Sequence, residues 1–181
     1  AVRSAFAQRG VGLIEIVAVD NSPEGSALSM FSVLEREAPC AFRWAHEPKP
    51  GVASARNAAL KLARGRYIAW LDDDEEASTD WLAALLRVRL DTGAQSVFGP
   101  VSARAHVGAS NAEFYERIYS RRGPAFAGLI RRAYGIGNSL QPRAIFEDDA
   151  FDLRADQTGG EDDRFFAARA QAGARFAWAP D

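Results

Sequence analysis

Short apolar runs typical of strands alternate along this chain with longer amphipathic runs typical of helices. The clearest apolar run, residues 67–71 (YIAWL), is followed at once by five acids, residues 72–76. Another run, residues 15–20 (EIVAVD), ends in Asp20. This alternation predicts an α/β fold with a mostly parallel sheet flanked by helices. Such sheets bind ligands beyond the carboxyl ends of their strands, which is where these acids lie.

The same patterns predict the positions of the individual elements. Strands are expected at residues 15–20, 42–46, 67–71, 96–101 and 175–178. Helices are expected at residues 2–8, 28–37, 54–64, 81–90, 111–122 and 161–172, with Thr79 or Asp80 capping the fourth. Residues 123–137 contain four glycines and are predicted to be rich in loops. A doubly wound domain normally opens on a strand, whereas this chain opens on a helix. We therefore expect its first strand to be absent or to lie upstream, in a truncated or partly ordered domain.

The amino-acid composition argues against several classes of function. The 22 Lys and Arg residues nearly balance 24 Asp and Glu residues, which argues against a nucleic-acid partner. Cys40 is the only cysteine, so the sequence offers neither an internal disulfide nor a cysteine-based zinc site, and a reducing cytoplasmic location is expected. The sequence contains no run of the ~18–20 apolar residues that would cross a bilayer. With 181 residues, the chain is long enough for one domain.

Five consecutive acids are unfavourable to place together, because like charges destabilise one another. A divalent cation removes that cost, and Mg²⁺ or Mn²⁺ prefers carboxylate oxygens. If the segment is extended, Asp72 and Asp74 face one ligand and Asp73 faces another. The alternative is a solvated turn before a helix, where acids also favour the helix N-terminus.

Two further motifs carry charged residues at predicted helix starts. Residues 159–163 (GGEDD) place acids in the first turn of a helix, which stabilises the ionised form that a general base needs; ordinary capping is the alternative. Residues 51–57 (GVASARN) place Arg56 early in a helix, where a cation is unfavourable to the helix dipole. This placement indicates a partner such as a phosphate or a carboxylate; a surface salt bridge to Asp20 or the acidic segment is the alternative.

Taken in order, the motifs resemble glycosyltransferase family 2, a family of inverting enzymes with the GT-A fold. The likeness is greatest to the bacterial exopolysaccharide branch of succinoglycan type. The matching segments are residues 17–22 (VAVDNS), 51–57 (GVASARN), 68–74 (IAWLDDD), 135–139 (GIGNS) and 159–163 (GGEDD).

The resemblance implies a donor side to the site. Asp20 corresponds to the aspartate that contacts the nucleotide base, and Arg56 to the arginine that assists nucleotide recognition. Asp72, Asp73 and Asp74 correspond to the D-x-D region, with Asp72 near the ribose and Asp74 as the metal ligand. The implied cofactor is Mn²⁺ or Mg²⁺.

The resemblance also implies an acceptor side. Asp162 corresponds to the base that deprotonates the acceptor hydroxyl, with Asp163 as the second choice. Glu161 is its neighbour, and Asn138 lies in the acceptor-side loop. These roles divide one domain, residues 1–181, into a nucleotide-binding half (1–101) and an acceptor-binding half (102–181).

The implied reaction is a metal-dependent, inverting transfer of a hexosyl group from a nucleotide-diphosphate sugar, with a UDP sugar favoured. The implied acceptor is a saccharide or a polyprenyl-diphosphate-linked saccharide, as in polysaccharide biosynthesis. Several arginines are candidates for contact with a lipid diphosphate or with the inner face of the membrane; a solvated helix face is the alternative for them. They are Arg117, Arg121, Arg122, Arg131 and Arg132.

Two other functions stay open. One is a non-catalytic nucleotide-sugar-binding domain. The other is an acid-cluster phosphohydrolase, which is disfavoured because Glu75 and Glu76 follow Asp74 where a D-x-D-x-[TV] nucleophile motif would continue.

Overall fold

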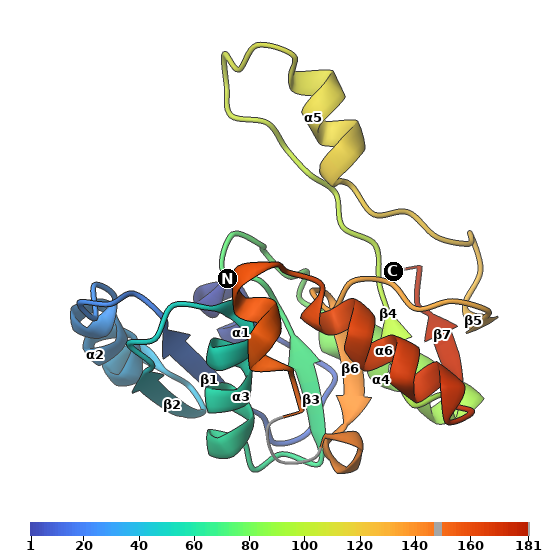
Figure 1. Ribbon diagram of the computed structural model, residues 1–181, viewed down its shortest axis with the longest axis horizontal. Helices are drawn as coiled ribbons and strands as arrows, with labels where there is room; N and C mark the ends of the chain where they lie inside the picture. The colour runs from blue at the N-terminus through green and yellow to red at the C-terminus, as the bar shows by residue number, and fades with distance from the viewer. Residues whose placement is uncertain (147–149, 181) are drawn as a thin grey trace.

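The computed structural model describes residues 1–146 and 150–180. Its strands are β1 (Glu15–Asp20), β2 (Ala41–His46), β3 (Tyr67–Trp70), β4 (Ser96–Phe98), β5 (Gly128–Ile130), β6 (Ser139–Pro142) and β7 (Phe176–Trp178). Its α-helices are α1 (Val2–Phe6), α2 (Leu28–Glu37), α3 (Val52–Leu62), α4 (Trp81–Thr92), α5 (Ala112–Tyr119) and α6 (Glu161–Gln171). Two 3₁₀ helices, η1 (Arg143–Ile145) and η2 (Leu153–Gln157), complete the elements (Figure 1).

The predicted α/β class is confirmed, and every predicted element is found within three residues of its expected bounds. Strands β5 and β6 were not predicted. β5 lies inside the segment expected to be loop-rich, and β6 follows it. Among the described residues no strand precedes β1.

The strands form two sheets. β1 and β2 pair in parallel, and the larger sheet has the order β3-β6-β4-β7-β5. In the larger sheet β4 and β7 are parallel, whereas β6 is antiparallel to both β3 and β4, and β5 is antiparallel to β7. The sheet is therefore mixed where a mostly parallel one was expected. The difference comes from β5 and β6, the two strands that sequence patterns did not predict, because each of them runs antiparallel to its neighbours.

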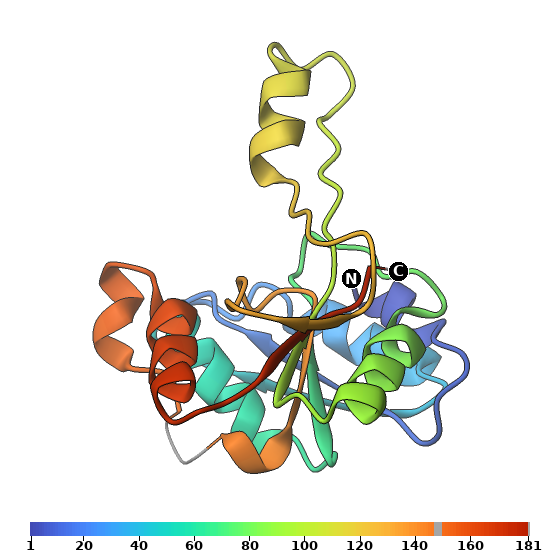
Figure 2. The ribbon, with the colours of Figure 1, turned by 90° about the vertical axis from the view of Figure 1, so that its right-hand side faces the viewer.

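Helices cover both faces of the larger sheet (Figure 2). Successive strand residues point to opposite faces, and this alternation separates two apolar clusters. Val97 and Ala177 pack with α4, whereas their neighbours Phe98 and Trp178 pack with α3 and α6. The α3 and α6 face is rich in aromatic rings; the Phe98 and Phe166 centroids lie 5.0 Å apart. This packing fixes the start of α6 beside the sheet.

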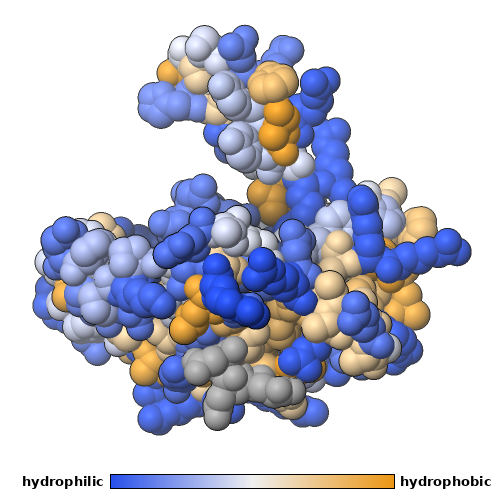
Figure 3. All heavy atoms as spheres, in the orientation of Figure 1, coloured by the Kyte–Doolittle hydropathy of each residue, from blue (hydrophilic) through white to orange (hydrophobic). Residues whose placement is uncertain are grey.

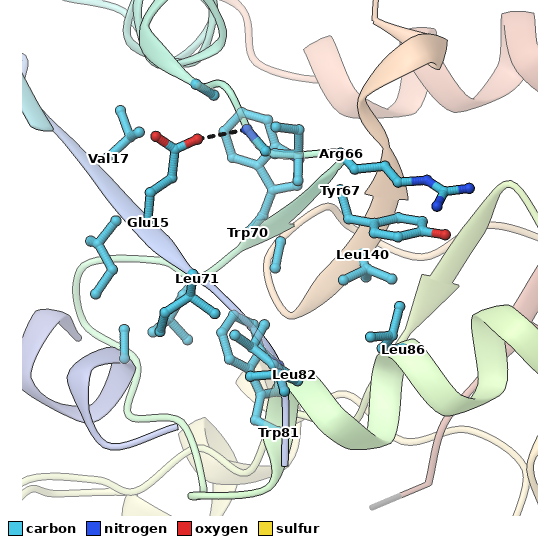
Figure 4. A pocket seen from close by; sticks show the side chains of 18 of the residues that line it. Glu15, Val17, Arg66, Tyr67, Trp70, Leu71, Trp81, Leu82, Leu86 and Leu140 are labelled. Carbon is cyan, nitrogen blue, oxygen red and sulfur yellow. Dashed lines mark hydrogen bonds between the residues drawn. The ribbon is translucent and has the colours of Figure 1, made fainter. Parts of the chain in front are cut away.

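A cavity of about 370 Å³ lies between β1 and β3 (Figure 4). Its wall is mainly apolar and includes Val17, Trp70, Leu71, Leu82 and Leu140. All four residues of β3 are only partly buried, although a wholly apolar sequence is typical of a buried strand. The open cavity along one side of β3 accounts for the difference.

An arm that carries α5 projects away from the body of the molecule (Figures 1 and 2). The segments that lead into and out of the arm pair with each other at an antiparallel bridge between Val101 and Arg121. Apolar side chains gather on the arm (Figure 3), and those that are exposed on α5 are Phe114, Tyr115, Ile118 and Tyr119. In the part of the chain that the structure describes, none of the helices combines the length and the apolar character needed to cross a membrane.

Candidate active site

Asp20 ends β1, and its carboxylate organises the turn that follows. One oxygen accepts hydrogen bonds from the Ser22 backbone N–H at 2.9 Å and the Ser22 hydroxyl at 2.7 Å. The other oxygen accepts the Ala27 N–H at 2.6 Å. The Ser22 hydroxyl makes the largest contribution to lowering the pKa of Asp20, and the other bonds lower it further. The Asp20 side chain is therefore an ionised group that holds the turn between β1 and α2.

The acidic segment after β3 is a tight turn. The Glu75 N–H donates to the Asp72 carbonyl at 3.1 Å, and the Asp72 N–H donates back to the Glu75 carboxylate at 3.2 Å. Asp73 and Asp74 occupy the corners of the turn and are exposed. The expectation that an extended segment aligns Asp72 with Asp74 is therefore wrong. The physical reason is that a reversal over four residues removes the alternation of a strand.

Several carboxyl groups lie close together in this turn. Burial of the carboxyl is the largest cause of the raised pKa of Asp72, and the charge of Asp74 adds to it. Burial likewise raises the pKa of Glu75. The guanidinium groups of Arg56 and Arg121 act in the opposite direction on Asp72. The turn therefore concentrates negative charge that two arginines offset only in part.

A four-residue loop, residues 135–138, lies between the acidic turn and the start of α6. The Ile136 N–H donates to the Asp162 carboxylate at 3.0 Å. On the other side of the loop, a methyl group added to Gly137 would collide with the Asp72 carboxylate. The loop thus contacts the two carboxylates predicted to serve the donor and the acceptor.

Arg121 connects this loop to the root of the arm. Its Nε donates to the Gly99 carbonyl at 2.9 Å, and its Nη1 donates to the Gly135 carbonyl at 2.6 Å. Its Nη2 donates to the carbonyls of Gly137 and Asn138. Sequence reasoning placed Arg121 among surface arginines, whereas the structure places its head group inside the site.

Asn138 is tied to two other elements by its side chain. Its Oδ1 accepts the Trp81 indole N–H at 2.8 Å, and its Nδ2 donates to the Pro100 carbonyl. Its backbone has a φ of 47°, in the left-handed region that asparagine tolerates better than most residues. The side chain therefore anchors the loop to α4 and to the segment after β4. Its acceptor-side role stays a prediction.

Arg56 forms an ion pair with Glu161, which joins α3 to the first residue of α6. The two side chains are 14% and 9% exposed, so the pair is largely shielded from water. The guanidinium also lies 5.7 Å from the centre of the Phe151 ring. Of the partners considered from sequence, a carboxylate is the one found, and it belongs neither to Asp20 nor to the acidic turn.

The three acids that open α6 differ in their surroundings. Glu161 is buried against Arg56, and Asp163 is exposed. Asp162 lies between them in exposure; its second oxygen accepts the Asp163 N–H at 2.9 Å. Asp162 is therefore the acid of this group that contacts the 135–138 loop.

Asp156 was missed by sequence reasoning. Its carboxylate accepts the Ser54 N–H at 3.1 Å and the Ser54 hydroxyl at 2.6 Å, and so caps the start of α3 from η2. It also packs against Gly51, where a side chain would collide with it. Asp156 lies in no sequence motif, and no local signal indicates this long-range cap.

These contacts bring most of the predicted residues into one connected group. Contacts or electrostatic interactions link Arg56, Asp72, Asp74, Asn138, Glu161 and Asp162. Asp20 is not joined to this group by any described contact, although its strand ends in the neighbouring sheet. The cavity between β1 and β3 contains none of the predicted site residues.

Comparison with known proteins places this arrangement in a family. The model of Glycosyl transferase family 2 matches residues 1–153. The chain belongs to glycosyl transferase family 2. It is 34% identical over 177 residues to the succinoglycan biosynthesis protein ExoM of Rhizobium meliloti (strain 1021), covering 93% of this chain and 55% of ExoM. It is also 34% identical over 95 residues to ExoO of the same strain, covering 52% of this chain and 26% of ExoO.

Solved structures of this fold agree. The crystal structure of S. aureus TarS 1-349 in complex with UDP matches with a TM-score of 0.70 at 18% identity, over 99% of this chain and 53% of that one. A longer structure of S. aureus TarS gives the same TM-score and identity, with 32% of that chain covered. The GT-A fold predicted from the family motifs is thus confirmed. The chain spans about half the length of ExoM.

The donor set for the metal that the family implies consists of carboxylates. Within residues 1–146 and 150–180, no three His, Cys, Asp or Glu side chains are gathered in a way that could hold a metal ion. Mg²⁺ and Mn²⁺ are commonly held by one or two carboxylates together with substrate phosphates and water. The acidic turn, with Asp74 exposed beside Asp72, fits this kind of shared site.

Proposed function

We propose that this chain carries the catalytic domain of an inverting glycosyltransferase that moves a sugar from a nucleotide diphosphate to a hydroxyl group. The observation that carries the proposal is the loop that contacts both Asp72 and Asp162. A transferase must place its donor beside a base for the acceptor, and this loop holds candidate residues for both tasks next to each other. Membership of glycosyl transferase family 2 supports this function over an acid-cluster phosphohydrolase.

On the donor side, we assign Asp20 to the nucleotide base, Arg56 to nucleotide recognition, and Asp72 and Asp73 to the rest of the donor. Asp74 is assigned as ligand of Mn²⁺ or Mg²⁺. A bound cation would offset the negative charge that the leaving diphosphate develops. The negative charge concentrated in the turn supports this assignment, because the charges of Asp74 and Asp73 add to the burial that raises the pKa of Asp72. A UDP sugar is the favoured donor, and the UDP bound to TarS supports this choice.

On the acceptor side, Asp162 takes the proton of the acceptor hydroxyl as that oxygen attacks the anomeric carbon. Each of its oxygens accepts one backbone N–H, and a carboxylate has about four lone-pair sites, so capacity for a substrate hydroxyl remains. Attack from the face opposite the leaving diphosphate inverts the anomeric centre in one displacement. Asn138, Glu161 and Asp163 lie at or beside the loop and the base, on the same acceptor side.

The acceptor is proposed to be a saccharide or a lipid-linked saccharide, in polysaccharide biosynthesis. The likeness to the two succinoglycan biosynthesis proteins supports this class. A cytoplasmic location with peripheral contact to the inner face of the membrane is proposed with it. The exposed aromatic and aliphatic face of α5 is the surface suited to that contact, because amphipathic helices bury such faces at the lipid interface.

Binding of UDP with Mn²⁺ is the first test. We expect the two together to raise the melting temperature and EDTA to cancel the rise, because a ligand that binds only the folded state stabilises it. Asp74→Ala should remove the rise, while Asp91→Asn, an exposed acid on α4, should retain it. Absence of any shift with nucleoside diphosphates would contradict the proposal.

Turnover is the second test. Across a panel of UDP sugars, Asp162→Asn should lower donor turnover by about 100-fold or more, since a positioned base contributes a factor of this order. The asparagine oxygen can still accept the Ile136 N–H, so UDP binding should persist. Asp163→Asn is the matched control. Loss of turnover in that variant instead would move the base to Asp163, and binding without turnover in the unmodified chain would favour a non-catalytic nucleotide-sugar-binding domain.

A further inference from the structure

Arg121 joins three parts of the molecule that are distant in sequence. Its backbone pairs with Val101 at the root of the arm, through N–H to carbonyl bonds of 2.8 and 3.0 Å. Its Nε bonds the Gly99 carbonyl just after β4. Its two terminal nitrogens bond three carbonyls of the 135–138 loop. One side chain thus connects the arm, the end of β4 and the loop.

We propose that Arg121 is a positioning residue, whose guanidinium holds the 135–138 loop where it can orient Asp162 and pack against Asp72. The inference rests on the proposed function, because it assigns a task within the same site. Arg121 itself contacts backbone carbonyls, and it acts on the two carboxylates through the loop.

The composition of the loop explains why it needs such a residue. Gly135 and Gly137 have no side chains to anchor them, and glycine has the greatest backbone freedom of any residue. The carbonyls of Gly135, Gly137 and Asn138 converge on one guanidinium, whose planar group of five N–H donors can bond several acceptors at once. A lysine ammonium is a compact point charge with three donors and cannot reproduce this pattern.

The charges around Arg121 also favour this position of its guanidinium. The guanidinium interacts with the carboxylates of Glu75, Asp72 and Asp162, which lie on both sides of the loop. A cation on this side of the loop offsets the repulsion between the acidic turn and the start of α6. Arg122, the next residue, is exposed and provides a matched comparison of the same residue type and charge.

The test compares Arg121→Lys, Arg121→Gln and Arg122→Gln in the chain of residues 1–181. Hydrogen exchange of the Ile136 amide, which bonds Asp162, reports the position of the loop, and amides of α3 report global stability. We expect both Arg121 variants to speed Ile136 exchange by about tenfold or more, with α3 amides unchanged, because the opening is local. Arg122→Gln should leave both rates unchanged. The Trp81 indole N–H, which bonds Asn138, should shift its NMR signal in the Arg121 variants alone.

Exchange at Ile136 that is unchanged in both Arg121 variants would overturn the inference. Exchange that accelerates equally at Ile136 and in α3 would also overturn it, since Arg121 would then stabilise the whole fold and not position the loop.

A kinetic readout separates positioning from binding. With UDP-glucose as the probe, Arg121→Gln should lower kcat by about 100-fold while KM changes by less than about tenfold, because the loop misplaces Asp162, whereas on the donor side only its packing against Asp72 is lost. Arg121→Lys should recover less than a tenth of the lost kcat, since the charge alone does not hold the carbonyls. Unchanged kcat in Arg121→Gln would overturn the inference. If the unmodified chain neither binds UDP nor turns over UDP-glucose, the proposed function fails, and the Ile136 exchange still decides whether Arg121 positions the loop.

Discussion

Asp162 accepts a hydrogen bond from the amide of Ile136 at 3.0 Å, and the next residue of that loop lies against Asp72. The carboxylates of two acids from opposite halves of the chain therefore contact the backbone of one short loop. Substitutions in the loop should therefore disturb the contacts of both acids. Substitutions that remove the cap of α3 or its ion pair with α6 should lower the stability of these two helices.

The loop tolerates a methyl group at one glycine and not at the other. Gly137→Ala should lower the free energy of unfolding by about 1 kcal/mol, because its new Cβ collides with the Asp72 carboxylate, which must turn away from the loop. At Gly135 the new Cβ would lie 3.6 Å from its nearest neighbours, an ordinary contact. Gly135→Ala should therefore change the stability by less than about 0.5 kcal/mol. Urea denaturation of both variants checks this, and equal effects would contradict the close contact at Gly137.

The cap supplied to α3 from η2 should be measurable. Asp156→Ala should lower the free energy of unfolding by about 1–2 kcal/mol, since it removes two hydrogen bonds from the first turn of α3. Asp152→Ala is the comparison, because the Asp152 carboxylate lies near the surface, where it pairs with Arg154 and Arg164 and accepts the Arg154 N–H at the start of η2. Chemical denaturation should find a smaller loss there, of about 0–1 kcal/mol. A larger loss for Asp152→Ala than for Asp156→Ala would contradict the assignment of Asp156 as the acid that stabilises α3.

The effects on stability of removing Arg56 and of removing Glu161 should be strongly coupled. Removing either partner leaves a shielded charge alone, so Arg56→Met and Glu161→Gln should each cost about 3 kcal/mol. The double variant should cost less than the sum, with an interaction energy of about 1–3 kcal/mol. The exposed pair Arg3 and Glu37 supplies the control cycle, expected to give about 0–1 kcal/mol. Additive single effects at Arg56 and Glu161 would refute the coupling between α3 and α6.

Glu15 should make stability depend on pH in the acidic range. Burial alone would raise its pKa, but hydrogen bonds from the Arg64 and Gly65 amides and the Arg43 ion pair outweigh burial and lower the pKa below its usual 4.5. The carboxylate therefore stabilises the fold above pH 4.5, and that stabilisation is lost as the pH falls through the lowered pKa.

We expect Glu15→Gln to be less stable than the unmodified chain by about 1–2 kcal/mol at neutral pH. The difference should shrink as urea titrations are repeated at decreasing pH. Glu24→Gln, at an exposed position, should show no such trend. A difference for Glu15→Gln that is constant with pH would contradict the assigned bonds.

Local sequence patterns predicted the helices and the apolar strands well. The bounds of β1 and α2 are those expected, because an apolar run, a turn cluster and a helical repeat are signals contained within a few residues. Strand β6 was missed because it includes Ser139 and Gln141, polar residues that a local pattern assigns to a loop. Both are fully buried only because β6 lies between β3 and β4.

Local patterns also could not predict contacts in which one segment caps or holds another that is distant in the sequence. Thr79 or Asp80 was expected to cap α4, yet neither makes a side-chain bond to the helix start. Instead Gln8, which follows α1, accepts the Leu82 N–H at 3.0 Å. The family motifs identified Asp72 and Asp162, but their common neighbour Arg121 lies outside those motifs, because its place depends on how the arm returns to the body.

The position of β6 has a consequence for how the protein forms during synthesis. β3 and β4 both hydrogen-bond to β6 within the larger sheet, and β6 ends at Pro142. A nascent chain that has emerged only as far as β4 therefore lacks the strand on which both of these strands assemble. Such long-range pairings form slowly because the intervening chain must first be closed into a loop. The sheet that holds β3 and β4 can therefore close only after residues 139–142 have been synthesised.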